Sequence, residues 1–219
     1  MERGTGRRTQ HGFSFGAHYD PEWLSFGPMV CHDDHLLGSG EGFDEHPHSD
    51  LEIVTYVVSG SLVHTDSLGT SAALEAGEVA VLSAGSGVRH SELAAQTGSA
   101  RFVQVWLRPD AVGTAPTYAR GSTEAAAPGA GLVPVAGTGT SLAIGVAGAS
   151  YAVARLAADE KLILRPAARQ HVYVASGSLT RSSLAAPLEA GDAFCFVDEP
   201  THQVRAAVAT ELLVWSFTS

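Results

Sequence analysis

The sequence predicts an all-β chain built from two related barrels. Short segments rich in β-branched and aromatic residues recur about every 8–12 residues with turn signals between them, which is typical of a sandwich or barrel. Apolar periodicity of the helical kind is scarce, and many of the 24 glycines fall in short turn-like clusters. The second half of the chain also repeats motifs of the first, which favours two barrels over one.

The strand-like segments are clearest in the first half. Residues 51–63 read LEIVTYVVSGSLV, and Gly60 interrupts this run as a hairpin turn would. Residues 79–82 and 101–107 are further strand-like runs, and the latter stops at Pro109. Such short runs, separated by turns, predict strands of one barrel.

Two motifs of the first half return in the second half in the same order. SGSL occupies residues 59–62 and 176–179, and LEAGE at 74–78 returns as LEAGD at 188–192. Their glycines lie 17 residues apart in the first half and 14 in the second. Matches in one order at similar spacing indicate an internal duplication.

These patterns predict three parts of the chain. We expect an N-terminal barrel over residues 1–112, a linker over 113–140 and a C-terminal barrel over 141–219. The linker follows from composition, because Ala, Gly, Thr and Pro dominate that stretch and large apolar residues are few.

Composition excludes several classes of protein. The formal net charge of −10 repels phosphate backbones, and the basic run Arg7-Arg8 is interpreted as a solvated terminus, so nucleic-acid binding is not expected. No window approaches about 18 apolar residues and no apolar leader is present, so neither membrane insertion nor export is expected. Cys31 and Cys195 lie far apart, which favours reduced thiols and a cytoplasmic location.

Two segments carry the strongest chemical signal. His46 and His48 are two residues apart, and so are His90 and Glu92. Side chains at positions i and i+2 of a strand point to the same face, so both pairs converge if their strands line one barrel. Three imidazoles and a carboxylate suit a divalent first-row metal with positions left for water or substrate, whereas no thiolate is present for a softer metal.

Each part of this pattern also has a plainer interpretation. Two histidines on a strand are often only a solvent-exposed face, and Gly85 and Gly87 before His90 are also typical of a flexible surface loop. Near a metal site, the same glycines would permit positive φ or a close backbone approach. The combination of both pairs in a β-rich chain favours the metal site.

Two motif spacings resemble those of the cupins: Gly40-x5-His46-x-His48-x3-Glu52-x7-Gly60 and, lengthened, Gly77-x7-Gly85-x-Gly87-x2-His90. In many cupins the metal carboxylate comes from the first motif, at the position of Glu52. In pirin-like proteins it comes two residues after the last histidine, where this chain has Glu92.

Longer strings resemble the pirin family, especially its bacterial members. They are HGFSFGAHYDP at 11–21, GFDEHPHSDLEIVTYVVSGSLVHTDSLG at 42–69 and SAGSGVRHSE at 83–92. The resemblance is strong over about residues 11–110 and weak but compatible over 140–219.

The resemblance implies a bicupin, two double-stranded β-helix (jelly-roll) barrels, with one metal in the N-terminal barrel. The implied ligands are His46, His48, His90 and Glu92. Iron(II) is the expected metal, with zinc, manganese, cobalt, nickel and copper as alternatives. Glu52 is left with a structural role, such as pairing with Arg89 or with a backbone donor.

The second half departs from the metal pattern. Counting back from Gly177 as the partner of Gly60, the places of His46 and His48 fall near Ile163 and Arg165, which are not expected to bind a metal. We interpret the remaining histidines as structural or surface residues, although His18 and His35 could reach the pocket: His11, His18, His32, His35, His64, His171 and His202.

Pirin-like proteins are associated with quercetin 2,3-dioxygenase activity, so the resemblance implies a metal-dependent dioxygenase that cleaves a flavonol with O2. The metal would lower the pKa of a bound flavonol hydroxyl, and Glu92 would take its proton as a general base. The resulting enolate would meet O2, and ring cleavage with release of carbon monoxide follows by analogy with the family.

Two other functions stay open at this point. The chain could be a regulatory or redox-sensing pirin that binds a protein partner without turnover, with the metal ordering the barrel. It could also bind a small oxygenated metabolite without any chemistry, and fold analogy alone does not choose among these. We expect a monomer in each case.

Overall fold

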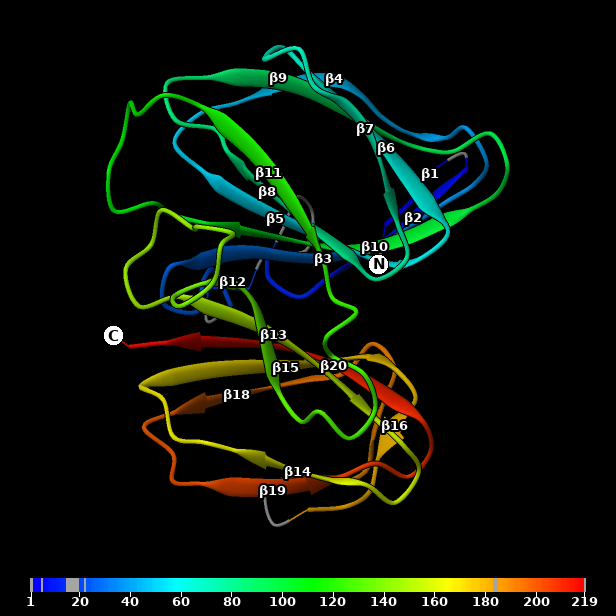
Figure 1. Ribbon diagram of the computed structural model, residues 1–219, viewed down its shortest axis with the longest axis vertical. Coiled ribbons are helices and arrows are strands. Elements are labelled where there is room, and N and C mark those ends of the chain that lie inside the picture. Colours follow the sequence, from blue (N-terminus) through cyan, green and yellow to red (C-terminus); the bar gives the residue numbers. More distant parts are fainter. Residues whose placement is uncertain (1, 5, 15–19, 22, 183–184, 219) are drawn as a thin grey trace. The chain divides into compact units, whose positions relative to one another are not determined.

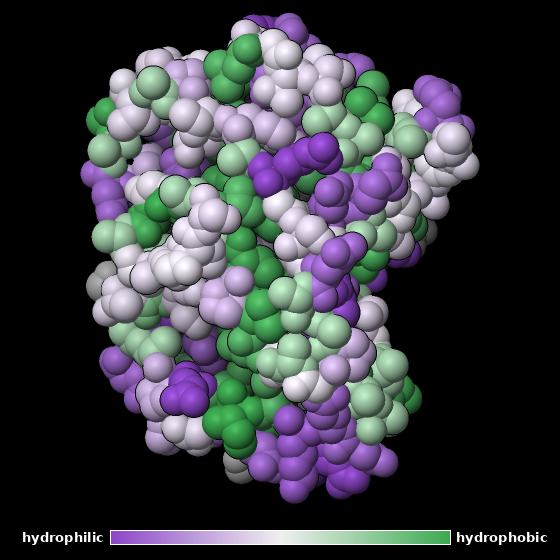
Figure 2. Space-filling view, in the orientation of Figure 1, coloured by the Kyte–Doolittle hydropathy of each residue, from purple (hydrophilic) through white to green (hydrophobic). Residues whose placement is uncertain are grey.

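The computed structural model describes residues 2–4, 6–14, 20–21, 23–182 and 185–218, and they form strands and turns without a helix. None of these residues belongs to a helix long and apolar enough to cross a membrane. The chain divides into two compact units (Figure 1), the first comprising Met1–Ser122 with Ile144–Val146 and the second Thr123–Ala143 with Ala147–Ser219. On the face shown in Figure 2, hydrophilic and hydrophobic residues are interspersed on each unit.

The first unit contains two sheets, and the chain crosses between them several times. Its strands are β1 (Glu2–Gly4), β2 (Arg7–His11), β3 (Met29–Leu37), β4 (Gly42–His48), β5 (Glu52–Ser59), β6 (Ser61–Asp66), β7 (Ser71–Glu75), β8 (Glu78–Ser83), β9 (Val88–Ala94), β10 (Ala100–Leu107) and β11 (Thr117–Ser122). The seven-stranded sheet has the order β1-β2-β3-β10-β5-β8-β11, and the four-stranded sheet has the order β4-β9-β6-β7.

The core of the first unit lies between these sheets. Val57 and Phe102 from the larger sheet pack with Leu62 and Leu74 from the smaller one, and all four are almost fully buried. Burial of such side chains stabilises each by about 1.5–3 kcal/mol relative to exposure. The two sheets are therefore held face to face by their apolar inner residues.

The second unit has the same design with shorter strands. They are β12 (Val133–Gly137), β13 (Ser150–Leu156), β14 (Lys161–Leu164), β15 (Arg169–Ser176), β16 (Ser178–Leu179), β17 (Leu188–Glu189), β18 (Ala193–Val197), β19 (His202–Arg205) and β20 (Thr210–Phe217). One sheet has the order β12-β13-β20-β15-β18, and the pairs β14-β19 and β16-β17 face its core.

Matching strand orders confirm the internal duplication and the all-β bicupin fold. The order β3-β10-β5-β8 corresponds to β13-β20-β15-β18, and β4-β9-β6-β7 corresponds to β14-β19 and β16-β17, which a bridge from Leu179 to Ala206 connects. Gly60 and Gly177 of the repeated SGSL motif adopt φ of +76° and +79° in equivalent turns. A Cβ at either position would also collide with a backbone carbonyl, so both turns require glycine.

The predicted linker segment, residues 113–140, carries two strands. β11 pairs with β8 in the first unit, and β12 pairs with β13 in the second. The boundaries at residues 112 and 141 stay predictions.

The second unit fills the places of the paired histidines with leucines. Leu162 and Leu164 point into its core, whereas Ile163 is 50% exposed. The count that placed these positions near Ile163 and Arg165 therefore falls one residue beyond the inward-facing leucines. The reason is the connection to the next strand: residues 165–168 join β14 to β15, one residue more than 49–51 between β4 and β5, so a constant offset between the halves selects the outer face.

Two buried histidines of β3 predict that the fold is sensitive to acid. Burial lowers the pKa of His32 to about 4 and that of His35 to about 3, whereas an unfolded histidine titrates near 6.5. The unfolded chain therefore binds more protons below pH 6.5, and stability is lost as the pH falls. Between pH 7.5 and 5 we expect each histidine to lower the free energy of unfolding by about 2 kcal/mol.

Urea unfolding at several pH values measures this loss. The variant His35→Gln removes one of the two groups, so its stability should fall less steeply with pH than that of the unaltered protein. Equal slopes for the two proteins over this range would contradict the assignment.

Candidate metal centre

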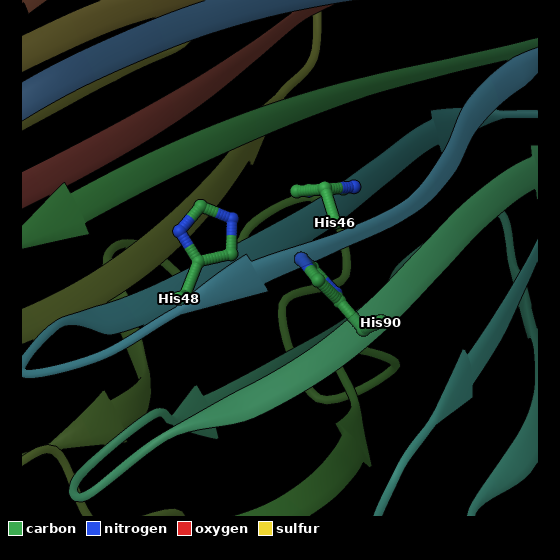
Figure 3. A group of neighbouring side chains, drawn as sticks. All are labelled: His46, His48 and His90. Atoms are coloured by element: carbon green, nitrogen blue, oxygen red, sulfur yellow. The ribbon is translucent and has the colours of Figure 1, made fainter.

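Three imidazoles meet on the inner face of the four-stranded sheet. His46 and His48 project from β4, and His90 projects from the neighbouring strand β9 (Figure 3). The register places His46 directly opposite His90. One ring nitrogen from each of these histidines lies within 4.8 Å of a ring nitrogen of the other two. The predicted pair, His46 and His48, therefore does meet His90.

An irregularity in β4 produces this arrangement. The register with β9 shifts between Phe43, which faces Glu92, and His46, which faces His90. Such a bulge bends a strand and re-aims its side chains. Gly42 lies where the strands approach closely, because a Cβ there would collide with the carbonyl oxygen of Glu92.

The three imidazoles have ring nitrogens whose lone pairs are available to a ligand or metal. Burial lowers the pKa of His48 to about 4 and that of His90 to about 3, and the neighbouring imidazoles lower both further. Both rings are thus neutral at neutral pH. Nε2 of His48 and both ring nitrogens of His90 are buried without a hydrogen-bond partner. The Nδ1–H of His46 donates to the carbonyl of Asp44 at 2.7 Å, which leaves its Nε2 for another partner.

Buried imidazole nitrogens without partners are costly in a protein interior unless something binds them. Neutral imidazole is a common ligand of divalent first-row metals. The donor set of His46, His48 and His90 therefore fits a transition metal.

Glu92 lies beside this group with its own hydrogen bonds. The side chain is 3% exposed, and the amide Nε2 of Gln104 donates to both carboxylate oxygens, at 3.0 and 2.7 Å. Trp106 Nε1 donates to Gln104 Oε1 at 2.9 Å and so fixes which way the amide points. A ligand oxygen of Glu92 lies within 4.8 Å of His90 and His64, and the four-residue set of the sequence analysis stays a prediction.

His64 belongs to the same polar interior, which sequence reasoning missed. It stands opposite Glu92 across β6 and β9, and its Nε2 donates to Asp66 Oδ2 at 3.0 Å. Its ring stacks on Tyr118 at 4.4 Å. Burial would raise the pKa of Asp66, but the bonds from His64, Thr70 and Leu68 hold it below its ordinary value. The available signal was the i, i+2 spacing of His64 and Asp66, which places both on one face.

A cavity of about 280 Å³ adjoins the centre. It is lined by Arg7, Thr9, His11, Asp33, His35, Phe43, His46, Glu92, Gln104 and Trp106. His35 thus reaches the pocket, as the sequence allowed, and so does His11. His18 lies outside the described residues. His32 is buried in β3 and does not line this cavity.

Glu52 takes a structural part. Its Oε2 accepts hydrogen bonds from the Ser83 hydroxyl at 2.8 Å and the Gly145 backbone at 3.0 Å. The expected backbone donor is therefore present. The alternative pairing with Arg89 was wrong, because Nε of Arg89 donates to the exposed carboxylate of Glu45 on β4.

The remaining histidines lie in the second unit. His171 is buried on β15, and His202 stacks on Phe196 at 5.2 Å. Both groups of metal-ligating side chains found among the described residues lie in the first unit.

Substitution of the candidate ligand that both groups share should weaken metal binding. His90 takes part in both groups, so His90→Gln should weaken nickel(II) or iron(II) binding at least about a hundredfold. Calorimetric titration of the metal-free protein and elemental analysis measure this loss. His202→Gln, in the second unit, is the matched control and should still bind one metal per chain. Metal retained by His90→Gln, or lost by His202→Gln, would contradict the location of the site.

Comparison with known proteins identifies the relatives of the chain. The sequence profile of the Pirin family matches residues 1–107. A Mycobacterium tuberculosis protein named "Putative quercetin 2,3-dioxygenase" is 37% identical over 213 residues, which covers 95% of this chain and 87% of that protein. A Pseudomonas aeruginosa protein with the same description is 35% identical over 210 residues, which covers 94% of this chain and 90% of that protein.

The crystal structure of the bacterial pirin YhhW from Escherichia coli in complex with nickel(II) superposes with a TM-score of 0.88 at 28% identity, covering 99% of this chain and 94% of that one. The chain belongs to the pirin family.

Proposed function

We propose that this pirin is a metal-dependent oxygenase of the quercetin 2,3-dioxygenase type, which cleaves a flavonol with O2. The observation that carries the proposal is that a candidate metal ligand, His46, and a buried carboxylate, Glu92, line one cavity. The description of the relatives as putative quercetin 2,3-dioxygenases supports the same reaction.

The metal would be held by His46, His48 and His90, with Glu92 as the fourth ligand that we propose. Iron(II) is the metal we propose, and the nickel(II) of the Escherichia coli relative supports a site for divalent first-row metals. When bound, such a metal supplies Lewis acidity that favours the ionised form of a substrate hydroxyl.

Glu92 would receive the proton from that hydroxyl by turning one of its oxygens away from the metal. A carboxylate acts as a general base when it lies within hydrogen-bond reach of the proton and is poised in the right orientation. Two hydrogen bonds from Gln104 hold Glu92 in place, and Trp106 holds Gln104. When one oxygen of Glu92 takes the proton, the other can keep its bond from the Gln104 amide.

The walls of the cavity suit an aromatic substrate. Phe43 and Trp106 offer flat apolar surfaces, and edge or stacked contacts with aromatic rings are favourable. The volume of about 280 Å³ is close to the lower limit of about 300 Å³ for small-molecule sites. The cavity therefore offers an aromatic wall beside Glu92 and His46.

Oxygen consumption with quercetin tests the proposal. The metal-loaded protein under air should consume O2 and form the ring-opened depside together with carbon monoxide. Glu92→Gln keeps the size of the side chain but removes the base, so turnover should fall at least about a hundredfold. Metal content measured on the same sample separates a lost base from a lost ligand.

Glu52→Gln is the matched control, because Glu52 bonds only to Ser83 and Gly145 in the hydrogen bonds described for it. It should retain turnover. No oxygen uptake and no depside with iron, manganese, cobalt, nickel or copper would overturn the proposal. That outcome would favour the regulatory function, in which a protein partner binds only the metal-bound or only the metal-free state.

A further inference from the structure

Arg7 is a wall residue of the cavity, although its sequence context suggested a solvated terminus. It begins β2, is half-buried and lines the same cavity as Glu92 and His46. Its guanidinium lies 4.5 Å from the centre of the Phe43 ring, and Nη1 donates to the carbonyl of Gly42 at 3.2 Å. The interpretation of Arg7 as solvated was therefore wrong, whereas its neighbour Arg8 is exposed.

The cavity wall carries two carboxylates besides Arg7, and each makes its hydrogen bonds elsewhere. Asp33 lies 2.9 Å from Nδ1 of His11, and Glu92 accepts hydrogen bonds from the Gln104 amide. Burial lowers the pKa of His35 to about 3, with the nearby Arg7 acting in the same direction, so this imidazole is neutral. In the part of the chain that the structure describes, no carboxylate pairs with Arg7.

Arg7 is also fixed close to the proposed base. Phe43 stands directly opposite Glu92 in the register of β4 and β9, and the Arg7 guanidinium stacks on that ring. Only the Phe43 ring therefore separates the Arg7 guanidinium from a ligand whose hydroxyl approaches Glu92. Stacking leaves most guanidinium donors free, and their planar fork matches a carboxylate.

We propose that the cavity takes a hydroxylated aromatic acid, whose hydroxyl approaches Glu92 while its carboxylate pairs with Arg7. This inference rests on the metal centre and the base of the proposed function, and it adds a class of ligand beyond the flavonols. One unpaired cation balances one negative charge, which favours a carboxylate over a doubly charged phosphate. The volume of about 280 Å³ accommodates one substituted aromatic ring.

A matched pair of probes isolates the carboxylate. The compounds 2,3-dihydroxybenzoate and catechol share the two hydroxyls and differ only in that group. Calorimetry with the nickel-loaded protein should give at least about tenfold tighter binding for the acid, the size of one charge-assisted hydrogen bond. Arg7→Met keeps the aliphatic stem over Phe43 but removes the charge, and it should reduce the preference to within about twofold.

Arg8→Met is the matched control, because it removes the same charge from an adjacent, exposed side chain. It should keep the full preference. Arg7→Lys should recover only part of the preference, since a lysine lacks the fork. Urea unfolding and nickel content of each variant verify that the fold and the metal site are intact.

The outcomes separate this inference from the proposed function. If the unaltered protein binds both probes equally, or Arg7→Met keeps the preference, the inference is overturned, even if quercetin is oxidised. If the preference and its loss are observed while no flavonol or aromatic acid consumes O2, the carboxylate site is supported and the oxygenase is overturned. Failure of the acid to bind at all also overturns the inference.

Discussion

The register of β9 between its two neighbours is the constraint on which the rest of the site depends. On one side it sets His46 opposite His90, and on the other it sets His64 opposite Glu92. Side chains alternate between faces with a period of two, so a slip by one residue would turn the whole set outwards. The shift within β4 and the close approach at Gly42 hold this register, because no side chain fits between the strands there.

Burial keeps these imidazoles neutral, and it also lowers the stability of the fold because their ring nitrogens lose hydrogen bonds to water. Removal from water lowers the pKa of His48 and His90 to about 4 and 3, which keeps the rings neutral but leaves polar nitrogens without partners. A metal bound by those nitrogens would offset this cost, and its binding would then stabilise the folded first unit. The second unit avoids the cost, because Leu162 and Leu164 occupy the equivalent inner positions of β14 and pack into an aliphatic core.

Local patterns in the sequence predicted the fold and three members of the site. The repeated SGSL and LEAG motifs identified the duplication, and the i, i+2 spacing of His46 and His48 placed both on one face. The rest depends on pairings between distant strands. His64 meets Glu92 only through the register of β6 with β9, and Arg7 meets Phe43 only because β2 joins the larger sheet. A single sequence carries no signal for either contact, and the connection from β14 to β15, one residue longer than that from β4 to β5, displaced the count into the second half by one residue.

The carboxylate and the imidazoles are positioned by different parts of the fold. His46, His48 and His90 depend on pairing within the four-stranded sheet, whereas Glu92 is oriented from the opposite sheet by Gln104 and Trp106 of β10. Strand β9 sets the spacing of Glu92 from His90, and the packing of the other sheet against it sets how the carboxylate is turned. Two facing sheets with a dense apolar core deform little, because repacking even one buried side chain costs free energy. The orientation of Glu92 is consequently as rigid as the core beneath it, and Arg7, on β2 of the same larger sheet, reaches across to Gly42 and Phe43 of β4.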